Sequence, residues 1–112
     1  MKTQCKFFLT KDEEYILGPG KVQLLRLVDK SGSLRKAAQE MGMSYRWAWG
    51  RIKSAEEALG VSLLMQDEAS KSKVKVLTGD AREIIEWFSR TEAELAKVIE
   101  QAEKKQPKAL KG

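Results

Sequence analysis

A pair of short helices joined by only four residues, MGMS at 41–44, constrains the fold of this chain more than any other feature of its sequence. Ser33 is placed to cap the first helix, and Gly42 is placed to end it. Ser44 is placed to cap the second helix, which Gly60 ends. The residues expected at the helix crossing are small: Ala37, Ala38 and Ala48. Because so short a connection makes two helices cross at a steep angle, the pattern predicts a helix-turn-helix unit.

The second helix of this pair has an apolar and a polar face. Apolar residues recur at intervals of three and four, which predicts one inward stripe: Tyr45, Ala48, Ile52, Ala55 and Leu59. The residues left outside are cationic, aromatic or small: Arg46, Trp47, Gly50, Arg51, Lys53 and Ser54. Such side chains suit a DNA groove, because the first turns of a recognition helix reach base edges while its later turns move away from the duplex. We therefore predict that this helix reads DNA.

The aromatic residues of this helix leave alternatives open. Trp47 faces outward and suits either a thymine methyl group or a protein partner. Trp49 borders the inward stripe, and we favour a structural role in which it props the helix against its neighbours. Tyr45 is expected to turn its ring inward while its hydroxyl reaches a phosphate.

A small hairpin and a further helix are predicted before this unit. Apolar residues at 7–9 and 15–17 flank a polar turn at 11–13, as in a β-hairpin. The GPG sequence at 18–20 ends the hairpin and begins a helix that runs to about Lys30.

A second hairpin and a long helix are predicted after the unit. Residues 61–67 and 74–78 read as two short strands around a polar loop at 68–73. Thr78 can cap the last helix, which extends to about residue 104. Its apolar residues include a strict seven-residue series with others between: Ala81, Ile84, Ile85, Phe88, Leu95, Val98, Ile99 and Ala102. Because seven-residue spacing is typical of a coiled coil, we expect these residues to form a dimer interface, with packing on the chain's own domain as the alternative.

The elements together predict a mainly α fold with small β-hairpins. It is a winged helix-turn-helix with an N-terminal hairpin and a long C-terminal dimerisation helix. We expect residues 1–78 to form the DNA-binding domain, 79–104 the dimerisation helix, and 105–112 a flexible tail.

Two quoted stretches carry a resemblance to known regulators. The stretch SGSLRKAAQEMGMSYRWAWGRIKSAEEALGVSLL, followed by VKVLTGDA, resembles the helix-turn-helix of LysR-type regulators. It is more similar to the N-terminal domain of molybdate-responsive, ModE-type regulators, in which LGPG opens the first helix after a hairpin. The similarity covers roughly residues 5–100.

The resemblance implies a bacterial or archaeal transcription regulator that is dimeric through helices outside its reading head. It places these residues at reading-helix positions: Ser44, Tyr45, Arg46, Trp49, Gly50, Arg51 and Lys53. Full-length ModE-type regulators carry C-terminal molybdate-binding domains, and this sequence ends about where those would begin, so we expect a chain without one of its own. The wing of that family is often glycine-rich, whereas here it reads DEASKSK, so its mode of contact is expected to differ.

Composition excludes several function classes. The net charge is +5, and the whole excess lies in residues 1–78, which favours an anionic partner there. The single Cys5 and the absence of His make an internal disulfide impossible and a zinc site or other metal site unlikely on composition grounds. With no secretory signal and no apolar run of membrane-spanning length, we expect a cytoplasmic protein that does not enter a membrane.

We therefore expect a homodimeric, DNA-binding transcription regulator with an inverted-repeat operator in double-stranded DNA. The expected DNA contacts lie on the reading helix and the wing: Ser44, Tyr45, Arg46, Trp47, Trp49, Gly50, Arg51, Lys53, Lys71 and Lys73. The alternative is a winged-helix protein-interaction module that works with a separate regulator. An enzyme is not expected, because the sequence has no His, no glycine-rich phosphate loop and no nucleophile–base pair at usable spacing. No cofactor or small-molecule site is evident.

Overall fold

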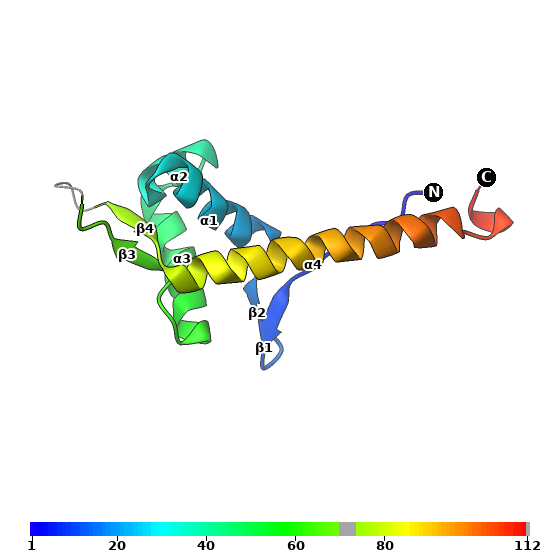
Figure 1. The fold of residues 1–112 in the computed structure, drawn as a ribbon, viewed down its shortest axis with the longest axis horizontal. Coiled ribbons are helices and arrows are strands. Elements are labelled where there is room, and N and C mark those ends of the chain that lie inside the picture. The colour runs from blue at the N-terminus through cyan, green and yellow to red at the C-terminus, as the bar shows by residue number, and fades with distance from the viewer. Residues whose placement is uncertain (70–73, 112) are drawn as a thin grey trace.

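The order of elements agrees with the predicted winged helix-turn-helix (Figure 1). The structure is a computed structural model, and it describes residues 1–69 and 74–111. Its elements are β1 (Leu9–Lys11), β2 (Glu14–Leu17), α1 (Pro19–Ser31), α2 (Leu34–Glu40), α3 (Tyr45–Leu59), β3 (Leu64–Gln66), β4 (Lys75–Leu77), α4 (Gly79–Lys104) and a 3₁₀ turn at Lys108–Leu110.

The helices begin at the residues that the sequence predicted. Ser33 Oγ accepts a hydrogen bond from the Lys36 N–H at 3.1 Å, and Ser44 Oγ accepts one from the Trp47 N–H at 3.1 Å. Thr78 caps α4 in the same way. Each bond satisfies one of the four backbone donors that a helix start leaves free, which fixes where the helix begins.

The core forms where α1, α2 and α3 pack together. The predicted crossing residues of α2 and α3 are fully buried: Ala37, Ala38 and Ala48. Ile52 and Ala55 continue the α3 stripe into the core, and Tyr45 and Leu59 pack at its margin. The small residues let the two helices approach closely, so the inward stripe of α3 is confirmed.

Each of the two hairpins is shorter than predicted. The strands β1 and β2 pair antiparallel around a turn at Asp12 and Glu13, whose φ angles are +52° and +68°. The wing consists of β3, β4 and the loop between them, with Leu64 paired to Leu77. In the first hairpin, residues 7–8 lie outside the strand because Phe7 packs instead on α4, with its ring 4.4 Å from that of Phe88.

The first half of α4 belongs to the core of the same chain. Ala81 and Phe88 are fully buried, and Ile84 and Ile85 pack against the core cluster. Arg26 of α1 reinforces this packing, since its Nη2 lies 2.6 Å from Ser89 Oγ and 3.0 Å from Glu92 Oε1. Ala81 and Phe88 thus pack within their own chain, which is the alternative that the sequence left open, whereas Ile84 and Ile85 keep part of their surface and their place in a dimer interface stays a prediction. Residues on both sides of the predicted boundary at 78 and 79 pack in one core cluster, and the division into a DNA-binding domain and a dimerisation helix stays a prediction.

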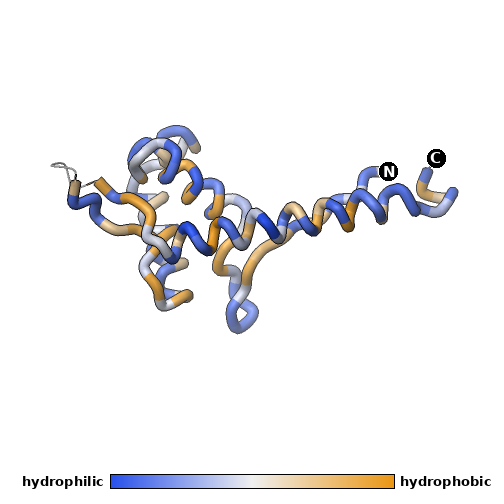
Figure 2. The backbone as a smooth tube through the Cα atoms, viewed as in Figure 1, coloured by the Kyte–Doolittle hydropathy of each residue, from blue (hydrophilic) through white to orange (hydrophobic). Residues whose placement is uncertain are grey.

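The second half of α4 extends away from the core (Figure 1). With 26 residues, α4 is about 39 Å long, and the whole molecule measures 61 × 30 × 22 Å. Apolar and hydrophilic residues alternate along this projecting part (Figure 2). Leu95 and Ile99 are half-buried there, while Val98 and Ala102 are exposed.

The N-terminal segment, residues 1–8, lies along α4, which the sequence did not predict (Figure 1). The Thr3 N–H donates to Glu103 Oε1 at 3.1 Å. Gln106 Nε2 donates to the Met1 carbonyl and to Thr3 Oγ1, both at 2.9 Å. The described residues 105–111, predicted to form a flexible tail, thus contact the N-terminus through Gln106, and their flexibility stays a prediction. No helix in the described ranges is long and apolar enough to span a bilayer.

We expect Glu13→Gly to raise the free energy of unfolding by about 0.5–1 kcal/mol, because glycine adopts a positive φ without the steric cost that glutamate carries there. Chemical denaturation measures the change. Glu14→Gly, in the adjacent strand, is the matched control and should destabilise by about the same amount, because there glycine only adds freedom to the unfolded chain. Two losses of similar size would contradict the role of the turn.

Candidate nucleic-acid interface

The outer face of α3 presents the cationic and aromatic residues that the sequence singled out. Arg46 and Lys53 are exposed, and the Trp47 side chain is 61% exposed. Ser44 and Gly50 are exposed beside them, whereas Arg51 is half-buried. The inward stripe fixes this orientation, since rotation of α3 about its axis would bring Trp47 into the packed core.

A cavity of about 460 Å³ opens on this face. Residues from β2, α1 and α3 line it: Tyr15, Lys21, Ser44, Arg46, Trp47, Gly50, Arg51 and Ser54. The lining contains three cationic side chains and no carboxylate. The N-terminal hairpin and the start of α1 thus extend the face of the reading helix, a continuity that the sequence alone did not indicate.

Lys21 is the functional candidate that sequence reasoning missed. It is only 7% exposed, and its Nζ donates to the Ile16 carbonyl at 2.9 Å and lies 5.1 Å from the centre of the Tyr15 ring. Burial lowers the pKa of Lys21, and the positive charge of Arg51 lowers it further. The one signal in the sequence was a lysine directly after GPG, next to the apolar residues of α1.

Tyr45 and Trp49 lie to the sides of this face. The Tyr45 ring is half-buried, and Arg35 Cζ lies 4.6 Å from its centre. The Trp49 ring lies 5.7 Å from Lys53 Nζ and borders a small cavity between α3 and the wing. Trp49 is 43% exposed, so its structural role and its contact with DNA both stay predictions.

The wing is attached to α3 by Glu56, a residue that looked like an ordinary helix former in the sequence. Glu56 Oε2 accepts from the backbone N–H groups of Leu63 at 2.7 Å and Leu64 at 3.2 Å. Lys53 Nζ lies 3.7 Å from the other carboxylate oxygen. Thr78, which follows β4, also holds the base of the wing, since its Oγ1 donates to the Ser62 carbonyl at 2.7 Å. The two wing lysines predicted to bind phosphate, Lys71 and Lys73, lie outside the described residues.

The described residues show no group of three or more His, Cys, Asp or Glu side chains that could hold a metal ion. Cys5 is a free, exposed thiol. The side chains that line the cavity on this face are cationic, aromatic and hydroxyl-bearing.

Sequence comparison connects this face with known regulators. Residues 20–81 match the family described as bacterial regulatory helix-turn-helix protein, lysR family. The molybdenum-pterin-binding protein MopB of Rhodobacter capsulatus is 29% identical over 89 residues, which cover 79% of this chain and 33% of that protein. This chain thus spans about a third of the length of that relative.

Solved structures share the fold at low sequence identity. The CbnR_DBD–DNA complex has a TM-score of 0.58 at 18% identity, covering 75% of this chain and 92% of the other. ArgP from Mycobacterium tuberculosis has a TM-score of 0.54 at 19% identity, covering 76% of this chain and 30% of that one. CbnR, a LysR family transcriptional regulator, has a TM-score of 0.56 at 18% identity, covering 75% and 28%. These similarities confirm the winged helix-turn-helix fold with a long C-terminal helix.

We expect Glu56→Gln to lower the free energy of unfolding by about 1–2 kcal/mol, because the neutral amide accepts more weakly than the carboxylate from two wing N–H groups. Hydrogen exchange at Leu63 and Leu64 should speed up as the wing base loosens. Glu57→Gln is the matched control, since Glu57 is exposed on the next position of α3. Equal effects of the two substitutions on stability and exchange would show that Glu56 does not anchor the wing.

Proposed function

Because the chain belongs to the lysR family of bacterial regulatory helix-turn-helix proteins, a family of DNA-binding transcription regulators, we propose that it reads a duplex operator with α3 as part of a homodimer. The observation that carries this proposal is the exposed cluster of Arg46 and Trp47 at the start of α3. Within residues 1–69 and 74–111, neither Arg46 nor Arg51 forms an ion pair, so both guanidinium charges are free for an anionic partner. The family and the fold are those of regulators, and we propose no catalytic activity.

The contacts follow from the position of each side chain on α3. Arg46 has the reach and the donor geometry to bind guanine O6 and N7, and Trp47 can pack on a thymine methyl group. Ser44 lies at the helix N-terminus, where a phosphate is favoured, and Lys53 lies further along where a duplex backbone would pass. Lys71 and Lys73 of the wing complete the proposed contacts with phosphates. We place such a regulator in the cytoplasm, where its DNA is.

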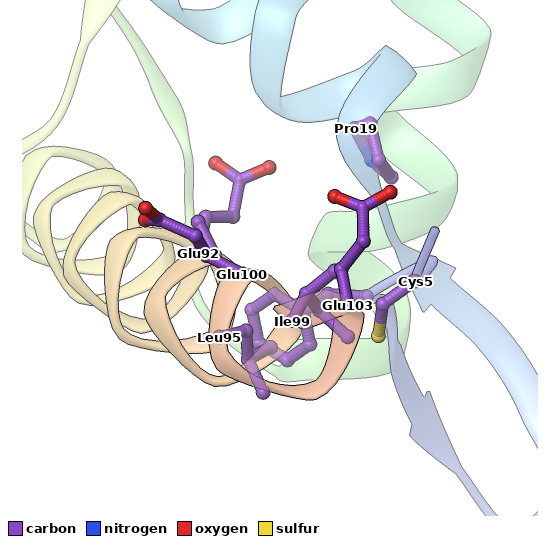
Figure 3. Close-up of a pocket in the computed structure, with 9 residues that line it drawn as sticks. Cys5, Pro19, Glu92, Leu95, Ile99, Glu100 and Glu103 are labelled. Carbon is purple, nitrogen blue, oxygen red and sulfur yellow. The ribbon is translucent and has the colours of Figure 1, made fainter. Parts of the chain in front are cut away.

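The proposed dimer interface is the part of α4 beyond the core. It presents an apolar strip of four residues: Leu95, Val98, Ile99 and Ala102. Val98 is 62% exposed, and Leu95 and Ile99 border a cavity of about 360 Å³ next to Cys5 of the N-terminal segment (Figure 3). A second α4 packed along this strip would bury it. The twofold symmetry of such a dimer would set the two reading helices one or more turns of DNA apart, in steps of about 34 Å, and so require an inverted repeat.

We expect selection of bound duplexes from a random pool to return an inverted repeat for the wild-type protein. On the selected duplex, log K should fall with log salt at a slope of about −5 to −7, if a dimer neutralises about 6–8 phosphates. Arg46→Ala should lose preference at one base pair of each half-site, a cost of about 1–3 kcal/mol there, because the bidentate contact is gone. An unchanged motif would show that Arg46 does not read a base. A slope near zero, with equal affinity for an acidic peptide, would favour a protein partner instead of DNA.

We expect Leu95→Glu to dissociate the dimer, because it places two carboxylates in an apolar seam where nothing compensates their desolvation. Light scattering measures the mass, and thermal unfolding checks that the winged helix-turn-helix stays folded. Ala93→Glu is the matched control: Ala93 is exposed, and helical geometry places it on the opposite side of α4, so the same charge there should leave the mass unchanged. An intact Leu95→Glu dimer would overturn the proposed interface.

A further inference from the structure

The cavity beside α3 is lined by two cations besides Arg46, and no carboxylate lines it. Lys21 lies in the wall formed by the start of α1, and Arg51 lies in the wall formed by α3. A Cβ built on Gly20 would lie 3.5 Å from Arg51 Nη2, so the guanidinium packs against the first turn of α1, at the residue before Lys21. Two like charges that line one cavity, one of them on a side chain that is only 7% exposed, repel each other, and a bound anion would relieve this repulsion.

The donors of this pair are only partly used. An ammonium group has three N–H donors, and the Ile16 carbonyl takes one from Lys21 Nζ. The guanidinium of Arg51 has five donors, and among the described residues the arginine side chains that donate hydrogen bonds are Arg26 and Arg82. Tyr15, Ser44 and Ser54 add hydroxyl groups to the lining. Beside Arg46, the cavity therefore offers many donors and the positive charges of Lys21 and Arg51, which is the chemistry that recognises a phosphate-type oxyanion.

We propose that Lys21 and Arg51 together bind one phosphate oxyanion, and that in the DNA complex it is a backbone phosphate beside the bases that α3 reads. This inference rests on the proposed function, because the same cavity is bordered by Arg46 and Trp47 of the reading face. It assigns Lys21 a contact that the sequence did not suggest. It also assigns Arg51 to the phosphate backbone, so that Arg51 positions the protein on the duplex while Arg46 reads a base.

The first test uses the selected duplex and the full chain. Lys21→Met and Arg51→Met should each make the salt slope of DNA binding shallower by about 1 per protomer, and so by about 2 per dimer, because one phosphate contact per protomer is lost. The sequence selected from a random pool should stay the same in both variants. Arg51→Lys, which keeps a positive charge, should restore most of the slope. Lys30→Met, at the exposed far end of α1, is the control and should leave slope and motif unchanged.

Two outcomes of this test would overturn the proposal. A changed motif in Arg51→Met would show that Arg51 reads a base. An unchanged slope in both methionine variants would show that the pair binds no phosphate. Lys21→Met removes the hydrogen bond to the Ile16 carbonyl and can unfold the protein. If thermal unfolding shows that Lys21→Met is not folded, the result for Arg51→Met decides the test.

The second test separates the source of the oxyanion from the existence of the site. Inorganic phosphate is titrated into the DNA-free protein while the amide resonances of Gly20, Lys21 and Arg51 are followed by NMR. Saturable shifts that vanish in Arg51→Met would show that the site also takes free phosphate. The absence of shifts, with the salt slopes as expected, would show that only a duplex backbone supplies it. If the wild-type protein binds no duplex, the proposed function fails, and the phosphate titration alone then supports or overturns this site.

Discussion

The rotation of α3 about its own axis is the constraint on which the rest of the structure depends. Ala48 and Ile52 are fully buried against the neighbouring helices, so the opposite side of α3 must face solvent. A rotation of about 100°, one helical residue, would replace this pair by larger or charged side chains. The packing of Ala48 and Ile52 therefore determines that Arg46 and Trp47 project outward together. The apolar stripe of α3 thus sets both the packing of the core and the residues that α3 exposes.

The long helix α4 starts in the core of the winged helix-turn-helix and projects from it. Phe88 packs its first half into the core, and Arg26 of α1 donates a hydrogen bond to Glu92 of α4. The direction of the projecting half is therefore set by packing within one chain. The N-terminal segment adds a second support, since Thr3 and Gln106 tie it to the far end of α4. In a proposed dimer, a rigid α4 would set the distance between two reading helices, and thus the spacing of the operator.

Two polar residues determine the shape of the interface without being obvious in the sequence. Glu56 accepts from the wing, and Lys21 donates to the end of the N-terminal hairpin. Both contacts join residues that are close in space because separate elements fold against each other, which a local pattern cannot reveal. Helical periodicity gives no sign of a partner for Glu56, which follows the inward Ala55 on α3. The partial burial of its side chain is instead a consequence of where the following loop runs.

The sequence by itself determined the helix boundaries, the inward stripe of α3 and the placement of cations on its outer side. It could do so because serine and threonine caps, glycine ends and apolar spacing act within a few residues of chain. Only the tertiary structure decided that Phe88 packs inside its own chain, that residues 1–8 lie along α4, and that Lys21 meets Arg51. A seven-residue spacing specifies that a face must be buried, but not which surface buries it, because the hydrophobic effect is not directional. Packing between elements far apart in the sequence determines which surface buries the first half of α4.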